Sequence, residues 1–507
     1  MTADDAPIYH IQQWGEAKLA LDRSFDQCSR KRNSYSFGRT RGGHLRSPAG
    51  SGSAILTQLD SVETVQGPRA AEIAAGVGDH RGSLTTSRGR TYHRAVVGDM
   101  RKGTRRSGHR SGRMALAVVP LLSVIAVLVL ARSQDPPAGG VSCPGSASKL
   151  RVVELSGTSY EMGLTHGRTL QPEIRELVGR WKRDLEANYQ VPADVFIRRL
   201  LERTDFKSAI DRWTPGLLDE VRGIADGAGI DFDTIYAYQL IDEIWAMGPD
   251  LGFSKCTSVA AGPRNGRPAV VAQNLDVPAF YHGYQTVLRI RDDKNDLETL
   301  VFTIPGILGS NGLNSRSVGV CVNAVTQLAY SATGLPVVFV VRGILRQKTY
   351  KQAVKFLEDI RPGAPQTYVI GGPHEAAVFE RSAEKMSIFV PFEGAWFSYH
   401  TNHPMTNDDF NPRFPEMLKR NGMTLKSYQA SCPRFGYLGR RLKDNSAVLD
   451  TDALLSIFRD RASGINNGAT YGCTIMILGE KPELHIAPGR PDEVPFETLG
   501  FFPHPGR

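Results

Sequence analysis

The chain has 507 residues, of which 41% are hydrophobic and 22% charged, so it can bury a sizeable core and is long enough for roughly three domains. Its formal net charge of +9 would suit a nucleic-acid-binding protein, but much of the excess lies in the first 113 residues, where arginine dominates. No predicted helix carries lysine and arginine along one side, and no aromatic ladder alternates with basic residues. These features argue against nucleic acid as a partner.

The cysteines are spread through the chain and form no Cys-x-x-Cys pair, which excludes a zinc ribbon and is unlike a disulfide scaffold. They are Cys28, Cys143, Cys256, Cys321, Cys432 and Cys473. A disulfide between two of the last three stays open, because the chain is expected to be exported. The sequence contains no metal-ligand set and no phosphate-cradling glycine loop, so we expect no cofactor.

The N-terminal region predicts an exported protein. Residues 1–99 are rich in Gly, Ser, Arg and Thr and are expected to be disordered, or to be an extension that is not naturally translated. Residues 100–133 combine a basic stretch, 101–113, with an apolar run, 114–131, which fits either a cleaved signal or a retained membrane anchor. We therefore expect a membrane-anchored, periplasmic or extracellular protein. A third interpretation, in which the basic stretch binds anionic lipid, explains this region alone.

A Pro/Gly/Ser linker, 134–148, precedes a mainly helical segment, 149–255, whose first element is a strand from Leu150 to Leu155. Glycines after this strand predict close approach of one helix to another element, and His166 among them is interpreted as structural. Further helices are predicted to about Tyr189 and over Asp194–Arg203, Leu217–Gly229 and Asp231–Trp245.

After Cys256 the apolar period changes from that of helices to two, which is typical of strands. Strands are predicted over Pro268–Asp276, Thr286–Arg291, Glu298–Thr303, Val318–Val325, Thr367–Ile370, Ala376–Arg381, Met386–Val390, Trp396–Thr401, Cys473–Leu478 and Glu483–Ala487. Helices are predicted over Leu335–Arg346, Lys351–Ile360, Pro412–Arg420 and Asp452–Arg459. Many antiparallel strands with two sets of helices predict an α+β fold, a four-layer α/β/β/α sandwich.

Cys256 stands where a loop becomes a strand, between Lys255 and Thr257. A lone thiol at such a place suits a presented nucleophile, and its base would be its own α-amino group, freed by cutting the Lys255–Cys256 bond. The structural alternative is a small buried hydrophobe, which a free cysteine usually is.

Six motifs in one order resemble the acyl-coenzyme A:6-aminopenicillanic acid acyltransferase family. This family (isopenicillin-N acyltransferase-like, peptidase C45) is a branch of the N-terminal nucleophile hydrolases, related to cholylglycine and penicillin V amidases. The resemblance covers about Lys149 to Pro488. The motifs are Gly157-x-x-Tyr-x-x-Gly-x-x-His-Gly167, the helix end Gly223–Gly229, Cys256-Thr-Ser258, Gln273-Asn-x-Asp276, Gly312-Leu-Asn314 with Val318-Gly-Val320, and Thr401-Asn-His-Pro404.

The resemblance implies an inactive precursor that cuts itself between Lys255 and Cys256, giving an αβ heterodimer whose β chain, 256–507, is the catalytic sandwich. Cys256 would attack an amide or thioester carbonyl and form an acyl-enzyme. Asp276 matches the acid that holds the α-amino group and the thiol. Asn323 aligns with the oxyanion-hole asparagine, and Asn402 matches the asparagine bordering the same site.

The chain departs from the family pattern at its arginines. The amidase branch has an arginine near the position of Gln273, so that contact is missing or replaced. A second family arginine has two candidates, Arg342 and Arg461. His403 is interpreted as stabilising a turn before Pro404, and Asn466-Asn467-Gly468 as a turn.

The predicted function is a self-processing cysteine amidohydrolase or acyltransferase acting on a small acyl amide or acyl thioester. The two reactions share the acyl-enzyme and differ in whether water or an amine resolves it, so the sequence does not separate them. The alternative is a catalytically silent binding or structural sandwich domain tethered to a membrane, because a fold does not guarantee a function.

Overall fold

The computed structural model describes residues 150–249, 251, 256–292, 296–444 and 449–502, which belong to one compact unit of the chain. The predicted disordered region, basic stretch, apolar run and linker lie outside the described residues, as does Lys255. In the part that the structure describes, no helix is both long and apolar enough to cross a membrane.

The larger of two sheets has eight strands in the order β1-β4-β5-β6-β7-β8-β9-β10. All neighbours are antiparallel except β1 and β4, which run parallel. The strands are β1 Arg151–Leu155, β4 Thr286–Asp292, β5 Leu297–Thr303, β6 Asn311–Asn314, β7 Gly319–Ala324, β8 Gln366–Gly371, β9 Ala376–Arg381 and β10 Met386–Phe389.

The smaller sheet has six antiparallel strands in the order β11-β2-β3-β12-β13-β14. Its central strands β3 and β12 are buried along almost their whole length, as expected of strands covered on both faces. The strands are β2 Thr257–Ala261, β3 Ala269–Asp276, β11 Phe397–His400, β12 Thr470–Leu478, β13 Glu483–Ala487 and β14 Glu497–Leu499.

The helices fall into a group before Cys256 and a group after it. The first group is α3 Ser159–Thr169, α4 Gln171–Tyr189, α5 Ala193–Glu202, α6 Lys207–Trp213, α7 Leu217–Ala228, α8 Phe232–Tyr238 and α9 Ile241–Met247. The second group is α10 Val337–Leu345, α11 Tyr350–Asp359, α12 Arg413–Arg420, α13 Leu425–Ala430, α14 Pro433–Asp444 and α15 Thr451–Phe458, with a short 3-10 turn, η1, at Ala279–Tyr281.

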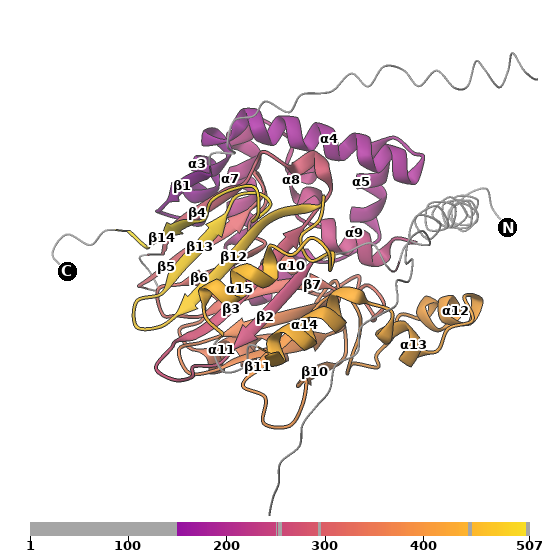
Figure 1. The fold of residues 1–507 in the computed structure, drawn as a ribbon. Coiled ribbons are helices and arrows are strands. Elements are labelled where there is room, and N and C mark those ends of the chain that lie inside the picture. The colour runs from indigo at the N-terminus through magenta and orange to yellow at the C-terminus, as the bar shows by residue number, and fades with distance from the viewer. Residues whose placement is uncertain (1–149, 250, 252–255, 293–295, 445–448, 503–507) are drawn as a thin grey trace, which may run out of the picture. The chain divides into compact units, whose positions relative to one another are not determined.

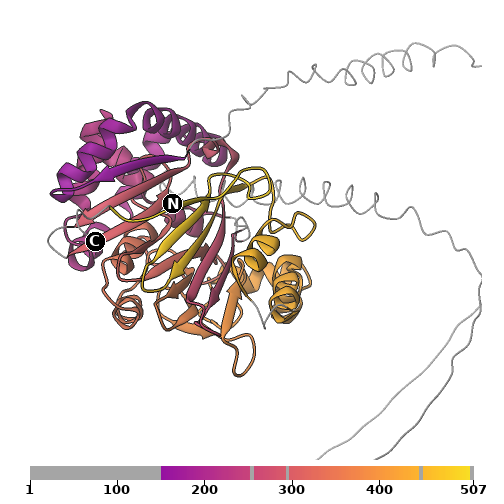
Figure 2. The same cartoon turned by 60° about the vertical axis from the view of Figure 1, so that its left-hand side comes forward.

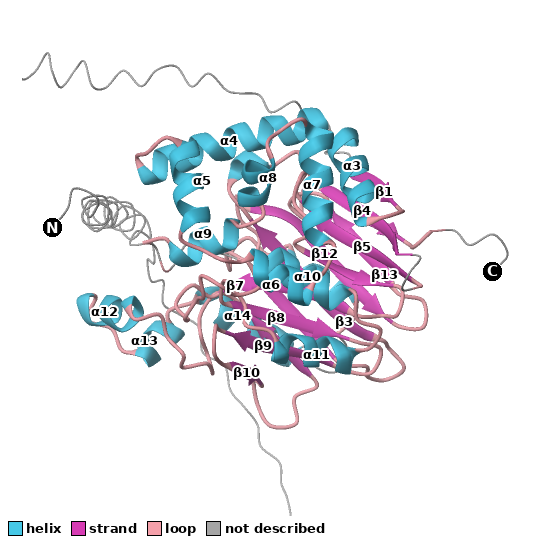
Figure 3. Ribbon diagram, turned by 180° about the vertical axis from the view of Figure 1, so that it is seen from behind, coloured by secondary structure: helices cyan, strands magenta, loops and turns pink. Residues whose placement is uncertain are grey.

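The two sheets pack face to face through β2 and β3 on one side and β7, β8 and β9 on the other. Helices α10 and α11 cover the outer face of the larger sheet, and α14 and α15 cover that of the smaller sheet (Figures 1 and 3). The turned view in Figure 2 shows the purple helices of the segment before Cys256 and the orange helices of residues 413–458 on opposite sides of the strands. The predicted α+β fold with α/β/β/α layers is confirmed.

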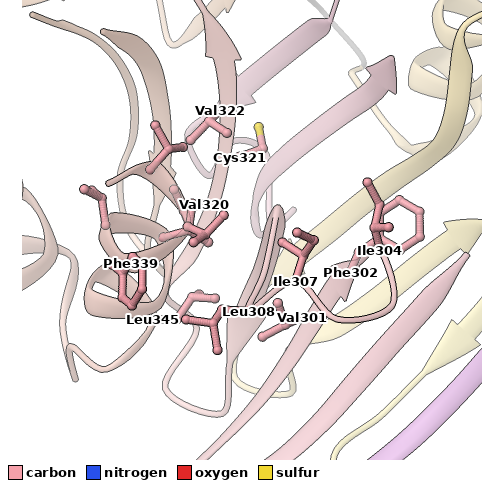
Figure 4. Close-up of a cluster of buried hydrophobic side chains, with 14 of the residues drawn as sticks. Val301, Phe302, Ile304, Ile307, Leu308, Val320, Cys321, Val322, Phe339 and Leu345 are labelled. Atoms are coloured by element: carbon pink, nitrogen blue, oxygen red, sulfur yellow. The ribbon is translucent and has the colours of Figure 1, made fainter. Parts of the chain in front are cut away.

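The hydrophobic core on the α10 side joins this helix to strands of the larger sheet. Figure 4 shows Phe339 of α10 near Val320 and Val322 of β7, with Ile304 and Ile307 on the neighbouring loop. The cysteines of the described part are all free, so no disulfide joins two of the last three. Cys321 and Cys473 are wholly buried in strands, as predicted.

Helices α3 and α7 touch backbone to backbone through glycines, as the sequence predicts. A Cβ atom on Gly163 would lie 1.9 Å from the carbonyl oxygen of Glu220, and one on Gly223 would lie 2.2 Å from that of Tyr160. No other residue type fits at this distance without displacing a helix. The glycine motifs near Gly157–Gly167 and Gly223–Gly229 therefore pack against each other.

The segment before Cys256 is an integral part of the sandwich. Strand β1 extends the larger sheet beside β4. Glu220 of α7 forms a buried ion pair with Arg342 of α10, with nitrogen–oxygen distances of 2.7 and 2.9 Å. The side chain of Gln239 donates to Gly306 O and accepts from Leu308 N. These contacts join the segments before and after the predicted cut site, and they do not depend on an intact Lys255–Cys256 peptide bond.

Two features differ from the sequence prediction. The single helix expected over 231–245 is two helices, α8 and α9, because the chain breaks where Gln239 bonds to the loop after β5. The short elements β6, β14, α6 and α13 and the longer helix α14 were not predicted. Helix α14 contains Gly436 and Gly439, which weaken its helical signal.

Candidate active site

Cys256 lies immediately before β2, at the end of the β2–β3 pair where Asp276 ends β3. Pairing of Thr257 with Asn274 brings these two residues together although they are 20 positions apart. The Cys256 Sγ atom accepts a hydrogen bond from Asp276 N at 3.5 Å and faces Asp276 O at 3.7 Å. The residue is 4% exposed, so it is held in a defined position at the base of the site.

The thiol of Cys256 is held in its neutral form in the uncut chain. Burial, followed by the negative charge of Asp276, raises its pKa to about 12, against the weaker opposing effects of Asp276 N–H and Arg434. The nitrogen of Cys256 is an uncharged amide in this chain, so it contributes neither a base nor a cation. A free α-amino group at this nitrogen would supply both.

Asp276 is held by Asn467, whose amide donates to Asp276 Oδ2 at 2.6 Å. The same amide group donates to Gly464 O at 3.1 Å, and its oxygen accepts from Ala469 N at 2.9 Å. Asn467 therefore lies in a turn, as predicted, but the turn also orients the carboxylate beside the thiol. The sequence contains no signal that links Asn467 to Asp276, because Asn467 lies in the turn before β12 and Asp276 ends β3, 191 positions earlier.

Arg434, at the start of α14, connects the cysteine with Asn402. Its guanidinium donates to Cys256 O at 2.7 Å, to Thr257 Oγ1 at 3.0 Å and to Asn402 Oδ1 at 3.0 Å. Asn402 in turn donates to Ala324 O at 3.0 Å. Arg434 was not predicted as a site residue, although Pro433 before it is a typical first residue of a helix and could have marked the position.

Asn323 is placed differently from its predicted role. Its amide donates to Ser258 Oγ at 2.8 Å and to His400 O at 3.2 Å, so both hydrogens are used between the sheets. Its oxygen accepts from Gln273 at 3.0 Å. The neighbours Val322 and Ala324 line the cavity at Cys256 instead, because side chains alternate along a strand.

Gln273 occupies the position where the amidase branch has an arginine. It is wholly buried, donates to Asn323 Oδ1 and accepts from Asn311 Nδ2 at 2.7 Å. This amide network joins β3 to β6 and β7 across the sandwich. A neutral network therefore replaces the charged contact that the family resemblance implies.

Neither arginine proposed from the sequence contacts the cysteine. Arg342 belongs to the buried pair with Glu220 and also donates to Leu308 O. Arg461 is exposed and pairs with Asp492 and Glu493. Both candidates are therefore replaced, because their guanidinium groups are paired with carboxylates elsewhere in the fold. Among the described residues, Arg434 contacts Cys256 instead.

The two histidines singled out by the sequence have structural surroundings. His166 is wholly buried, accepts a hydrogen bond from Gly306 N at 3.0 Å and has its pKa lowered to about 3 by burial and then by Arg342. His403 packs on the ring of Tyr428, with ring centroids 5.0 Å apart. Across residues 150–502, apart from the undescribed gaps, no group of three or more metal-binding side chains is present.

A cavity of about 60 Å³ opens onto Cys256 and Asp276. Its walls come from both sides of the predicted cut, mostly from apolar side chains. Tyr238, Gln239, Ile241, Asp242 and Trp245 precede Cys256, while Leu275, Val277, Tyr281, Ile304, Ile307, Gly309, Ser310, Val322, Ala324, Val337, Val338 and Gln366 follow it. This composition is typical of a small-molecule site with few polar groups.

Residues 263–474 match the family model described as acyl-coenzyme A:6-aminopenicillanic acid acyl-transferase. The matched range contains Asp276, Asn323, Asn402, Arg434 and Asn467, and it begins just after Cys256.

Two relatives are similar in sequence. Protein dcd1B from Dictyostelium discoideum is 23% identical over 280 residues, which are 49% of this chain and 54% of that protein. An uncharacterized protein from Archaeoglobus fulgidus is 22% identical over 284 residues, which are 50% of this chain and 47% of that protein. The chain thus spans about half the length of these relatives.

One solved structure that the chain matches is penicillin V acylase from Agrobacterium tumefaciens. The match has a TM-score of 0.29 and 13% identity, and it covers 46% of this chain and 82% of that one.

Proposed function

Because this chain belongs, through residues 263–474, to the acyl-coenzyme A:6-aminopenicillanic acid acyltransferase family, we propose that it is a self-processing amidohydrolase or acyltransferase with Cys256 as its nucleophile. The observation that carries the proposal is the meeting of the Cys256 thiol with Asp276 at one end of the β2–β3 pair, where a cavity opens. The remaining steps supply a base for the Cys256 thiol and a cation for the Asp276 carboxylate.

The first step is hydrolysis of the Lys255–Cys256 peptide bond. It consumes one water molecule and leaves a carboxylate on Lys255 and an amine on Cys256. Before this step the thiol is neutral, and its nitrogen carries no charge. The uncut chain is thus an inactive precursor.

The new α-amino group activates the thiol. Its ordinary pKa is about 8, so part of it is unprotonated near neutral pH and accepts the thiol proton. Once protonated, the ammonium is held by Asp276 and stabilises the thiolate. The bond from Arg434 to the Cys256 carbonyl survives the cut, and it keeps the new chain end in place.

The thiolate then attacks the carbonyl carbon of an amide or thioester, and the amine or thiol leaves with a proton from the ammonium. Of the two predicted oxyanion residues, we assign the donor to Asn402. Its amide makes one hydrogen bond among the described residues, whereas both hydrogens of Asn323 are used. An amide donor at an oxyanion is commonly worth about a hundredfold or more in rate. Water or an amine resolves the acyl-enzyme, giving hydrolysis or acyl transfer.

The test is the state of residue 256 in purified protein. We expect two fragments on a denaturing gel, with Cys256 as the new N-terminus by sequencing. Cys256→Ala should give one uncut chain and no turnover, because both the cut and the acyl-enzyme need the thiol. Cys473→Ala is the matched control, since Cys473 is also a buried cysteine but does not line the cavity, and it should be cut normally.

A single intact polypeptide that still turns over substrate would contradict this mechanism. Normal cutting in Cys256→Ala would refute the nucleophile. A thiol-reactive acyl probe that labels a residue other than Cys256, or none, would favour the catalytically silent alternative.

We also propose that the protein is exported, because residues 100–133 combine a basic stretch with an apolar run. The same N-terminal sequencing identifies the first residue of the mature α fragment. A fragment beginning after residue 131 indicates a cleaved signal, and one retaining 114–131 in a membrane fraction indicates an anchor.

A further inference from the structure

The cavity at Cys256 has an excess of negative charge. Two carboxylates line it, Asp242 and Asp276, and no lysine, arginine or histidine is found among its described lining residues. In the proposed function Asp276 is neutralised by the α-ammonium of Cys256. The carboxylate of Asp242 then remains without a cation in a largely apolar cavity, which is costly unless a ligand supplies one.

Asp242 is held toward the cavity by the protein. It lies in the first turn of α9, and Gln366 of β8 donates to its Oδ1 atom at 2.9 Å. Its side chain is half-buried, and burial raises its pKa to about 6 against the effect of Gln366. The carboxylate is therefore mostly ionised near neutral pH. The adjacent Glu243 faces away and accepts from Val337 N and Ala364 N.

Aromatic side chains line the same cavity as Asp242. Trp245 follows Asp242 by three residues and therefore lies on the same face of α9. Tyr238 and Tyr281 line the cavity as well, with ring centroids 6.5 Å apart and buried hydroxyls that interact with each other. A carboxylate among aromatic faces is the chemistry that binds an organic ammonium group.

We propose that Asp242 selects substrates whose acyl portion carries a cationic amine, bound between its carboxylate and the aromatic wall of Trp245, Tyr238 and Tyr281. The inference rests on the proposed acyl chemistry at Cys256 and names the substrate class of that site. It assigns a recognition role to the segment before the cut, because Asp242 and Trp245 both lie in it. Neutral acyl groups of the same shape bind less well, and anionic acyl groups are rejected.

The experiment compares matched acyl anilides on the purified, self-processed protein. A series of ω-aminoacyl anilides of increasing length is paired with alkanoyl anilides, in which a methyl group replaces the ammonium, and with the ω-carboxyacyl compounds. At the fitting length we expect kcat/KM for the amine to exceed that for the alkanoyl partner by about tenfold or more, the scale of one charge-assisted hydrogen bond.

Variants assign the preference to one residue. Asp242→Asn should lose most of the amine-to-alkanoyl ratio, and Asp242→Lys should turn the preference toward the carboxyacyl compound. Asp219→Asn is the control, because Asp219 is an exposed carboxylate of α7 paired with Arg222, and it should keep the ratio. If the Asp242 variants do not fold, the ratio measured on the unaltered protein still decides.

An equal kcat/KM for the amine and alkanoyl compounds at every length would overturn the inference while leaving the proposed function intact. So would an Asp242→Asn variant that loses activity equally on both with a shifted pH profile, because Asp242 would then act on the Cys256 amine. No acylation of Cys256 by any compound, in a protein that is never cut, would instead overturn the proposed function, and the inference with it.

Discussion

At the scale of single residues, the site depends on one cation that reaches three partners. The planar guanidinium of Arg434 bonds to Cys256 O, Thr257 Oγ1 and Asn402 Oδ1, and it carries positive charge toward the thiol. A lysine would supply the charge but not the geometry, because its ammonium is a point charge on a flexible stem. Arg434 is thus expected to position the nucleophile and Asn402 together.

We predict that Arg434→Lys lowers kcat/KM by about tenfold to a hundredfold, since small misplacements of reacting groups have effects of this size. The measurement is steady-state turnover of an acyl anilide, with the fraction of cut chain recorded in the same sample. Arg440→Lys, on the exposed side of the same helix, is the control and should behave as the unaltered protein. Full activity in Arg434→Lys would show that the contact with Asn402 is not needed.

At the scale of secondary-structure elements, the packing of α3 on α7 supports the helical layer whose last member, α9, forms a wall of the cavity. The two helices approach until glycine Cα atoms meet backbone carbonyl groups. These contacts leave no room for a side chain. The glycines are therefore needed because they lack a Cβ atom, and not because they make the chain flexible.

We predict that Gly163→Ala destabilises the protein by about 2–3 kcal/mol, the usual cost of overpacking, because the new Cβ would lie 1.9 Å from Glu220 O. The measurement is the midpoint of chemical denaturation. Gly179→Ala is the control, since its Cβ on α4 meets only the end of Arg183 at 3.7 Å. That variant should be neutral or gain up to about 1 kcal/mol from helix propensity. Equal midpoints for the two variants would contradict the packing argument.

At the scale of the whole molecule, the predicted cut falls between parts that share a sheet and a core. Strand β1 pairs with β4, and the ion pair of Glu220 with Arg342 is wholly surrounded by protein. Separating the parts would expose the apolar faces of the helices and leave both charges of the pair without partners, which is strongly unfavourable.

We therefore predict that the two fragments stay together as an αβ heterodimer after cutting. Size-exclusion chromatography under native conditions should elute both in one peak, and only a denaturant should separate them. Arg342→Met should weaken the association, because it leaves Glu220 buried and unpaired, whereas Arg316→Met, which removes an exposed pair with Asp296, should not. Release of a free N-terminal fragment by the unaltered protein would contradict the prediction.

Much of the fold was predictable from the sequence because long runs of alternating or helical periodicity specify elements locally. Strands β9 and β13 lie where the pattern placed them, and the change of period at Cys256 marks where the smaller sheet begins. Short elements were missed for the same reason: β6, β14 and α13 have too few residues to show a period. Helix α14 is longer, but Gly436 and Gly439 lower its helix propensity, so the sequence pattern does not reveal it.

The sequence by itself determined the layered α+β class, the family resemblance, and Cys256 and Asp276 as residues of one site. These follow from local pattern and from motifs that keep their order along the chain. Only the tertiary structure decided that Arg434 and Asn467, rather than Arg342 or Arg461, surround those residues, that Asn323 points between the sheets, and that Asp242 faces the cavity. The physical reason is that side-chain partners are chosen by strand register and helix packing across distant segments, which local composition does not encode.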